Sequence, residues 1–200
     1  MRITKYMHAA VRLERDGRAL LIDPGLWTEP EALANVDAIL VTHEHNDHLE
    51  PRVVEGVAAP IYAPEGADIA VPFTPVTSGE EFEVAGFRVR PVGDRHAYIY
   101  GEQPDCPNLG YVVDDLVYVP GDALHVPDGP IEVAFVPIHG SWMKVGEAID
   151  FVRAIAPAHA YPIHDGQLHD ERGGGANYWL AEECGTDWRR LAPGESVTTG

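Results

Sequence analysis

The opening of the chain alternates apolar and polar residues with the period of a β-strand. Residues 3–6 and 9–13 show this alternation, and a polar turn sequence follows at 15–17. Residues 19–22 then form another apolar run, which stops at the turn sequence of residues 23–25. Because strands joined by so few residues pair antiparallel, we expect the chain to begin with antiparallel strands.

The later patterns predict more strands and two helices. We expect strands at 36–41, as several short strands within 60–92, and at 110–113, 116–119, 131–138 and 158–163. Apolar residues recur at helical spacing between Val145 and Ala156, and Pro157 marks the end of this helix. A second, shorter helix is expected around residues 177–183. No repeat or linker divides the sequence, so these patterns predict one mixed α/β domain over residues 1–200.

Composition narrows the class of protein. Hydrophobic residues make up 45% of the 200 residues and charged residues 23%, which is typical of a globular chain. The net charge of −18 repels nucleic acid and anionic membranes, so neither is an expected partner. The two cysteines form no C-x-x-C pair, the N-terminus lacks a signal-peptide core, and no apolar run is long enough to span a membrane. We therefore expect a soluble cytoplasmic protein.

The most informative stretch is Thr-His-Glu-His-Asn-Asp-His at residues 42–48, directly after the predicted buried strand. Imidazoles and carboxylates are ligands that zinc and similar divalent ions accept. His43 and His45, two residues apart, could share one face and bind one ion, and Asp47 and His48 could then serve a neighbouring ion. A polar loop with incidental histidines is a poor explanation for so specific a spacing.

Further candidate ligands follow other predicted strands, namely His96, Asp122 and His164. If the ends of these strands lie at one edge of the sheets, the candidate ligands would lie around one metal centre. Seven donors suit two ions and leave room for a water molecule.

These motifs resemble the metallo-β-lactamase superfamily of αββα hydrolases over roughly residues 3–165. The nearest resemblance is to the small single-domain branch that includes the ascorbate-6-phosphate lactonase-like hydrolases. It implies two mixed β-sheets flanked by helices. It also implies one ion held by His43, His45 and His96, a second by Asp47, His48 and His164, and Asp122 as the bridge. The family likeness further suggests a homo-oligomer.

Other residues have two interpretations each. His139 stands where small relatives often have glycine-rich sequence, and either contacts substrate or relays a proton, or is a hydrogen-bonded loop histidine. His8 either orients a metal ligand or is an ordinary strand histidine. We expect structural roles for Asp23, and packing roles for Trp27 and Trp142. Asp165 is either an outer contact of His164 or solvated, whereas His125, His159 and His169 match no site pattern.

The expected function is metal-dependent hydrolysis of a small ester, lactone or phosphoester. A hydroxide bridging two divalent ions would attack the substrate, with Asp47 handling the water proton and His139 as a second catalytic candidate. Zn²⁺ suits the histidine-rich ligands best, while Mn²⁺ and Fe²⁺ accept the same donors. The alternatives are a phosphodiesterase of the same superfamily acting on a small phosphodiester and a degenerate metal-binding regulatory domain. The absence of a G-x-S-x-G motif argues against a serine hydrolase.

Overall fold

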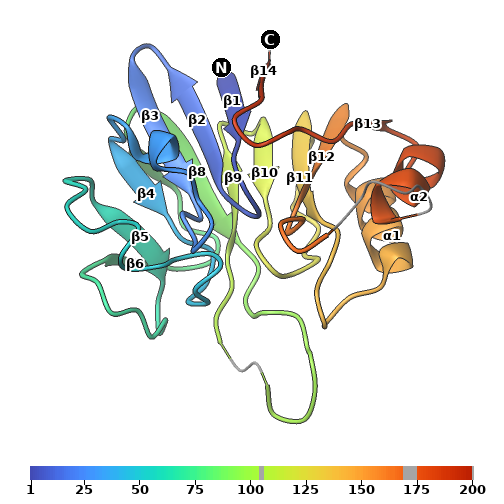
Figure 1. The fold of residues 1–200 in the computed structure, drawn as a ribbon, viewed down its shortest axis with the longest axis horizontal. Coiled ribbons are helices and arrows are strands. Elements are labelled where there is room, and N and C mark those ends of the chain that lie inside the picture. The colour runs from blue at the N-terminus through green and yellow to red at the C-terminus, as the bar shows by residue number, and fades with distance from the viewer. Residues whose placement is uncertain (104–105, 169–174, 200) are drawn as a thin grey trace.

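Two seven-stranded β-sheets face each other in this protein, and two helices lie on the outer side of one of them (Figure 1). The computed structural model describes residues 1–103, 106–168 and 175–199. The first sheet has the order β14-β1-β2-β3-β4-β5-β6, and the second has the order β13-β12-β11-β10-β9-β8-β7. This arrangement confirms the predicted fold class.

The elements have the following bounds. The strands of the first sheet are β1 Arg2–Lys5, β2 Val11–Arg15, β3 Arg18–Ile22, β4 Ala38–Leu40, β5 Ile61–Pro64, β6 Thr74–Val76 and β14 Ser196–Thr198. The strands of the second sheet are β7 Phe82–Val84, β8 Phe87–Val92, β9 Gly110–Val113, β10 Val117–Val119, β11 Val133–Pro137, β12 His159–Ile163 and β13 Asp187–Trp188. The helical elements are the 3-10 turn η1 Pro30–Leu33 and the α-helices α1 Val145–Ile155 and α2 Ala176–Glu183.

The main core lies between the sheets, and strand alternation decides which side chains enter it. Leu20 and Ile22 of β3 point into this core, while Leu21 between them points to the outer face. Likewise Phe135 of β11 faces the other sheet, whereas Val136 faces α1. Both faces of these central strands are therefore buried, which explains why their sequences are continuously apolar.

The outer faces of the two sheets are covered differently. Helices α1 and α2 pack on the second sheet through Ile149, Val152 and Leu180. On the first sheet, η1 and the loops around Leu49 and Val54 cover the apolar face in place of a long helix. Pro51, Gly56 and β-branched valines make the 49–57 segment a poor helix former.

Several element boundaries differ from the prediction. The second strand begins at Val11 because residues 6–10 close a tight turn, with the amide of Tyr6 donating to the carbonyl of Ala10. Strand β4 is limited to three residues. The short strands β13 and β14 had no visible alternation and were not predicted. Helix α1 ends one residue before the predicted end, with Ala156 in a left-handed conformation ahead of Pro157.

Strand direction determines where the candidate ligands lie. Strand β9 runs antiparallel to both β8 and β10, and β10, β11 and β12 are parallel, so β8, β10 and β12 all point the same way. The carboxyl ends of these strands therefore meet at one edge of the second sheet. His96, Asp122 and His164 follow those ends, as the sequence suggested.

No helix in the described part of the chain is long and apolar enough to cross a membrane.

Candidate metal centre

All seven candidate ligands come together at this edge of the sheets. The ligand atoms of His43, His45 and His96 lie within 4.8 Å of one another. A second group within the same limit contains Asp47, His48 and His164, together with His8, which the sequence had left undecided. A third group within this limit, His43, His48 and Asp122, takes residues from both of the sets that the resemblance implies.

Asp122 lies between the two groups. Its Oδ1 is 3.1 Å from His48 Nε2, and its Oδ2 is 3.0 Å from His164 Nε2 and 3.4 Å from His96 Nε2. One carboxylate thus reaches histidines of both groups, which is the arrangement that a bridging ligand requires.

A buried carboxylate supports the 42–48 loop from behind. Asp23, fully buried after β3, accepts hydrogen bonds from the backbone amide and the hydroxyl of Thr42, both at 2.7 Å. The same carboxylate is 2.7 Å from His48 Nδ1. Asp23 therefore has the structural role that we expected, and it also fixes the ring of one candidate ligand.

Outer hydrogen bonds fix the orientation of three candidate imidazoles. Because the Thr42 hydroxyl donates to Asp23, it accepts from His43 Nδ1 at 3.1 Å. His48 Nδ1 donates to Asp23, and His96 Nδ1 donates to the carbonyl of Ala97 at 2.7 Å. In each ring Nδ1 thus makes the outer hydrogen bond, which leaves Nε2 as the nitrogen available toward the cluster, as in metal-binding histidines.

Several polar atoms at the centre are buried without a hydrogen bond among the described residues. They are His48 Nε2, Asp122 Oδ1 and His164 Nδ1. His48 Nε2 and Asp122 Oδ1 face each other at 3.1 Å without hydrogen-bond geometry. Buried donors and acceptors are normally paired, so two ligand atoms that converge in this way fit a shared cation. The donor set, histidine nitrogen and carboxylate oxygen, fits a divalent metal ion.

Burial and neighbouring charges shift the pKa values of several side chains in this cluster. Burial, assisted by the neighbouring His48, lowers the pKa of His43 well below its usual value. Burial also opposes protonation of His164, but the hydrogen bonds to Asp122 and Asp47 outweigh it and raise its pKa to about 9. Asp122 is ionised, because the adjacent histidines overcome the burial that would raise its pKa. The carboxylates therefore attract positive charge to this point, whether protons or a metal ion.

A cavity of about 370 Å³ opens onto the candidate ligands. Besides ligands of both groups, it is lined by Ile99, His139, Gly140, Ser141, Trp142 and Gln167. Trp142 contributes more than packing, since its Nε1 donates to Asp122 Oδ2 at 3.1 Å. The ring of His139 stacks against that of His164 at 6.4 Å, and its buried Nδ1 has no hydrogen bond among the described residues.

The weaker sequence candidates lie in different places. Asp165 is neither solvated nor in the cluster, but forms a buried ion pair with Lys5 at 2.5 Å. His159 pairs with Asp187 on the surface, and His125 is exposed. His169 lies outside the described residues. Trp27 packs against the ring of His8.

Sequence reasoning missed two polar contacts near the centre. Lys5 is fully buried in a strand, and no pattern in the sequence paired it with Asp165. Cys106 lies with its sulfur 4.0 Å from His45 Nε2. Only the three-dimensional arrangement of distant segments reveals either contact.

Comparisons with known proteins indicate a single superfamily for this chain. Residues 2–164 match the family described as Beta-lactamase superfamily domain. Protein Rv0786c of Mycobacterium tuberculosis is 37% identical over 212 residues, covering 100% of both chains. The UPF0173 metal-dependent hydrolase Ta0764 of Thermoplasma acidophilum is 31% identical over 171 residues, covering 72% of this chain and 75% of its own.

Among solved structures, the metallo hydrolase Igni18 of Ignicoccus hospitalis shares the fold. Its TM-score is 0.76 at 19% identity, over 100% of this chain and 98% of its own. The family match over most of the chain, together with these relatives, confirms the resemblance inferred from the motifs. This chain belongs to the metallo-β-lactamase superfamily, in the small branch that includes the UPF0173 metal-dependent hydrolases.

Proposed function

We propose that this metal-dependent hydrolase uses two divalent ions to cleave a small ester, lactone or phosphoester. The observation that carries the proposal is the position of Asp122, whose two oxygens face histidines of both ligand groups. A cytoplasmic location and a small-molecule substrate, both expected from the sequence, are part of this proposal.

Seven side chains would hold the ions. His43, His45 and His96 form the first site, Asp47, His48 and His164 form the second, and Asp122 reaches both. When bound, two divalent ions would supply a hydroxide nucleophile near neutral pH and would polarise the substrate oxygen. Zn²⁺ is the ion that we propose first, because histidine supplies most of the donors.

Asp47 and His139 are the residues to which we assign proton transfer. The Asp47 side chain is 20% exposed and lines the cavity, so it reaches both the ligand group and the substrate space. The hydrogen bonds from His164 and His8 outweigh burial and lower its pKa, so the carboxylate is ionised and can hold the water by accepting a hydrogen bond from it. His139 faces the same cavity and is positioned to give a proton to the leaving group.

The cavity limits the substrate. Its volume of about 370 Å³ is at the small end of ligand pockets, which favours a small molecule. Trp142 and Ile99 provide apolar walls, while Ser141 and Gln167 offer hydrogen bonds to a polar substrate. A lactone or short ester has this combination of an apolar body and one polar reacting group.

The first experiment measures metal per chain in protein purified without chelator. We expect about two equivalents of zinc, or of manganese or iron. The loaded protein is then assayed against lactones, thioesters, phosphodiesters and β-lactams, alongside Asp47→Ala. The proposal requires a metal-dependent rate that collapses in this variant. Failure to bind metal after reloading, or full activity in Asp47→Ala, would overturn it and favour a degenerate binding domain.

A further inference from the structure

His8 is close enough to the second ligand group to act in either of two ways. Its Nε2 is 3.1 Å from Asp47 Oδ2, and its ring centroid is 4.2 Å from that of His164. It could bind the ion as an additional ligand, or it could act on the ion only through Asp47. The contact on the other side of the ring distinguishes these roles.

The second ring nitrogen of His8 accepts a hydrogen bond. The backbone amide of Gly166 donates to His8 Nδ1 at 3.2 Å. An imidazole nitrogen that accepts from an N–H carries no proton, so in the neutral ring the proton is on Nε2. Nε2 is then a donor to Asp47, and it has no lone pair to offer a metal ion.

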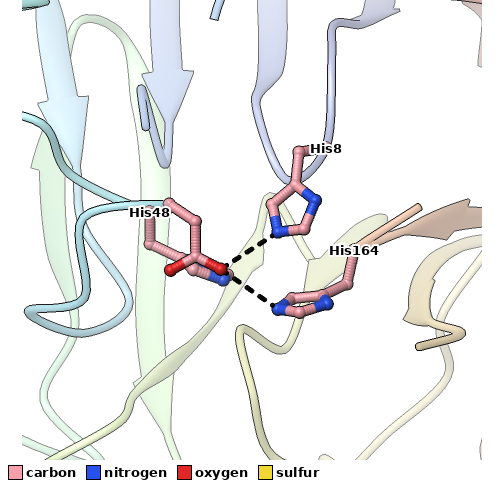
Figure 2. A group of neighbouring side chains, drawn as sticks. His8, His48 and His164 are labelled. Atoms are coloured by element: carbon pink, nitrogen blue, oxygen red, sulfur yellow. Dashed lines mark hydrogen bonds and ion pairs between the residues drawn. The ribbon is translucent and has the colours of Figure 1, made fainter. Parts of the chain in front are cut away.

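We propose that His8 is a positioning residue, which orients Asp47 for the second ion by donating Nε2–H to Oδ2 and does not bind the ion itself. This inference rests on the proposed two-ion function. Figure 2 shows His8 and His164 pointing at the same carboxylate oxygen from different segments of the chain. Because both imidazoles approach Oδ2, the other oxygen of Asp47, Oδ1, is left for the ion and the cavity.

The backbone holds His8 rigidly in this position. Its carbonyl accepts from the amide of His164 at 3.0 Å, so His8 bonds to the 164–166 segment through both its backbone and its ring. His8 has φ of 63° and His164 has φ of 58°, a left-handed conformation that side chains rarely adopt without support. His8 thus connects the turn between β1 and β2 in the first sheet to the segment after β12 in the second.

The surroundings leave His8 as a fixed donor. It is 1% exposed, and the Trp27 ring packs edge-on against it at 4.8 Å. Gly166 must remain small for the amide to reach the ring, because a Cβ there would lie 3.0 Å from His8 Nδ1. These contacts exclude solvent, so water would not easily replace the imidazole as the donor to Asp47.

Metal titration tests the role of His8 without relying on activity. Metal-free protein is titrated with Co²⁺, and binding is followed by its visible absorption. We expect His8→Ala to lower the affinity for the second equivalent of Co²⁺ about 10–100-fold, while the affinity for the first equivalent is unchanged. His8→Gln should recover most of this affinity, because its amide N–H reaches Asp47 as Nε2–H does. His159→Ala is the control, since it removes another histidine of a His–Asp pair far from the centre.

Two outcomes of the titration would overturn the inference. One is His8→Gln binding as weakly as His8→Ala, which would make His8 a ligand or a packing residue. The other is an equal loss at both ions, which would indicate a general structural defect. Thermal unfolding of each variant shows whether it has folded.

A second measurement separates this inference from the proposed function. The ring-nitrogen shifts of ¹⁵N-histidine-labelled, metal-free protein report the tautomer of His8, assigned by the signal lost in His8→Gln. We expect a proton on Nε2 only, and a proton on Nδ1 would overturn the inference. If wild type bound no metal, the proposed function would fail, while the tautomer would still decide the hydrogen-bond arrangement of His8.

Discussion

Asp23 lies behind His48, with Oδ2 2.7 Å from His48 Nδ1, while His48 Nε2 points forward at Asp122. Both Asp23 and His48 are fully buried. One imidazole thus connects a carboxylate that holds the loop with a carboxylate that faces both ligand groups. Such outer carboxylates orient metal-binding histidines and increase their basicity.

Asp23→Asn is expected to damage both stability and metal binding. The amide group would turn a donor toward the Thr42 hydroxyl and His48 Nδ1, which are themselves donors. We expect a loss of about 1–3 kcal/mol in the free energy of unfolding and about 10–100-fold in affinity for the second ion. Urea unfolding and metal titration measure these losses. Asp187→Asn, which alters the exposed pair with His159, should change the unfolding free energy by under about 0.5 kcal/mol.

Gly25→Ala should displace Asp47 through the backbone. A Cβ on Gly25 would stand 1.8 Å from the carbonyl oxygen of Asp47, so the two segments must separate. We expect destabilisation of about 1–3 kcal/mol and loss of the second ion. Gly146→Ala in α1 is the control, because its Cβ would meet nothing within 4 Å. It should stabilise by about 0.4–1 kcal/mol, and equal behaviour of the two variants would contradict the close approach.

Removal of metal by a chelator should lower the melting temperature. A ligand at 100 times its Kd stabilises the folded state by about 2.7 kcal/mol. For a domain of this size that corresponds to about 5–10 °C for each ion. Calorimetry with and without chelator measures the shift, and readdition of the ion should reverse it. An unchanged melting temperature after verified metal removal would contradict binding at the buried cluster.

His139→Ala should lower kcat and leave metal content intact. His139 faces the cavity but belongs to neither ligand group, so its loss should remove the proton transfer proposed for it without removing a ligand. A general acid contributes about 10²-fold or more to the rate. Steady-state kinetics and metal analysis check this, with the exposed His125→Ala as the matched histidine control. A raised KM with unchanged kcat would show that His139 only contacts substrate.

Asp37 should make stability depend on acid pH. Its pKa is lowered below 3.8, first by the hydrogen bond from the Ala19 amide and then by Arg18. Because the folded-state pKa is the lower one, the contribution is present above 3.8 and disappears as the pH falls through the folded value. Asp37→Asn should therefore cost stability at neutral pH and progressively less below pH about 4. Urea unfolding of metal-free protein across this pH range measures the difference in unfolding free energy between wild type and Asp37→Asn. This difference should not grow on acidification.

The clustering of the candidate ligands could be predicted largely from the sequence, because these residues follow strand ends. His43, His45 and their neighbours are contiguous, and the apolar run before them identifies the strand that positions them. His96, Asp122 and His164 required only the inference that similarly directed strands end at one edge. Helix α1 was equally predictable, because its apolar residues recur at helical spacing and pack on one face of the sheet.

Features that depend on distant contacts were not predictable. The donor role of His8 requires the Gly166 amide, which lies 158 positions away in the sequence. The partner of Lys5 is equally remote, and β14 forms because β1 offers it a free edge. Short strands such as β13 have too few residues for any alternation to be visible. In these cases tertiary contacts decide the structure and local propensity does not.

The distribution of the ligands over both sheets has a consequence for how the protein matures. The first group uses residues 43, 45 and 96, and the second joins residues 47 and 48 to residue 164. The second set of donors is therefore complete only when the chain is ordered as far as residue 164, and closing so long a loop is slow. Capture of the second ion should accordingly be a late event in folding, which locks a nearly finished structure and does not nucleate it.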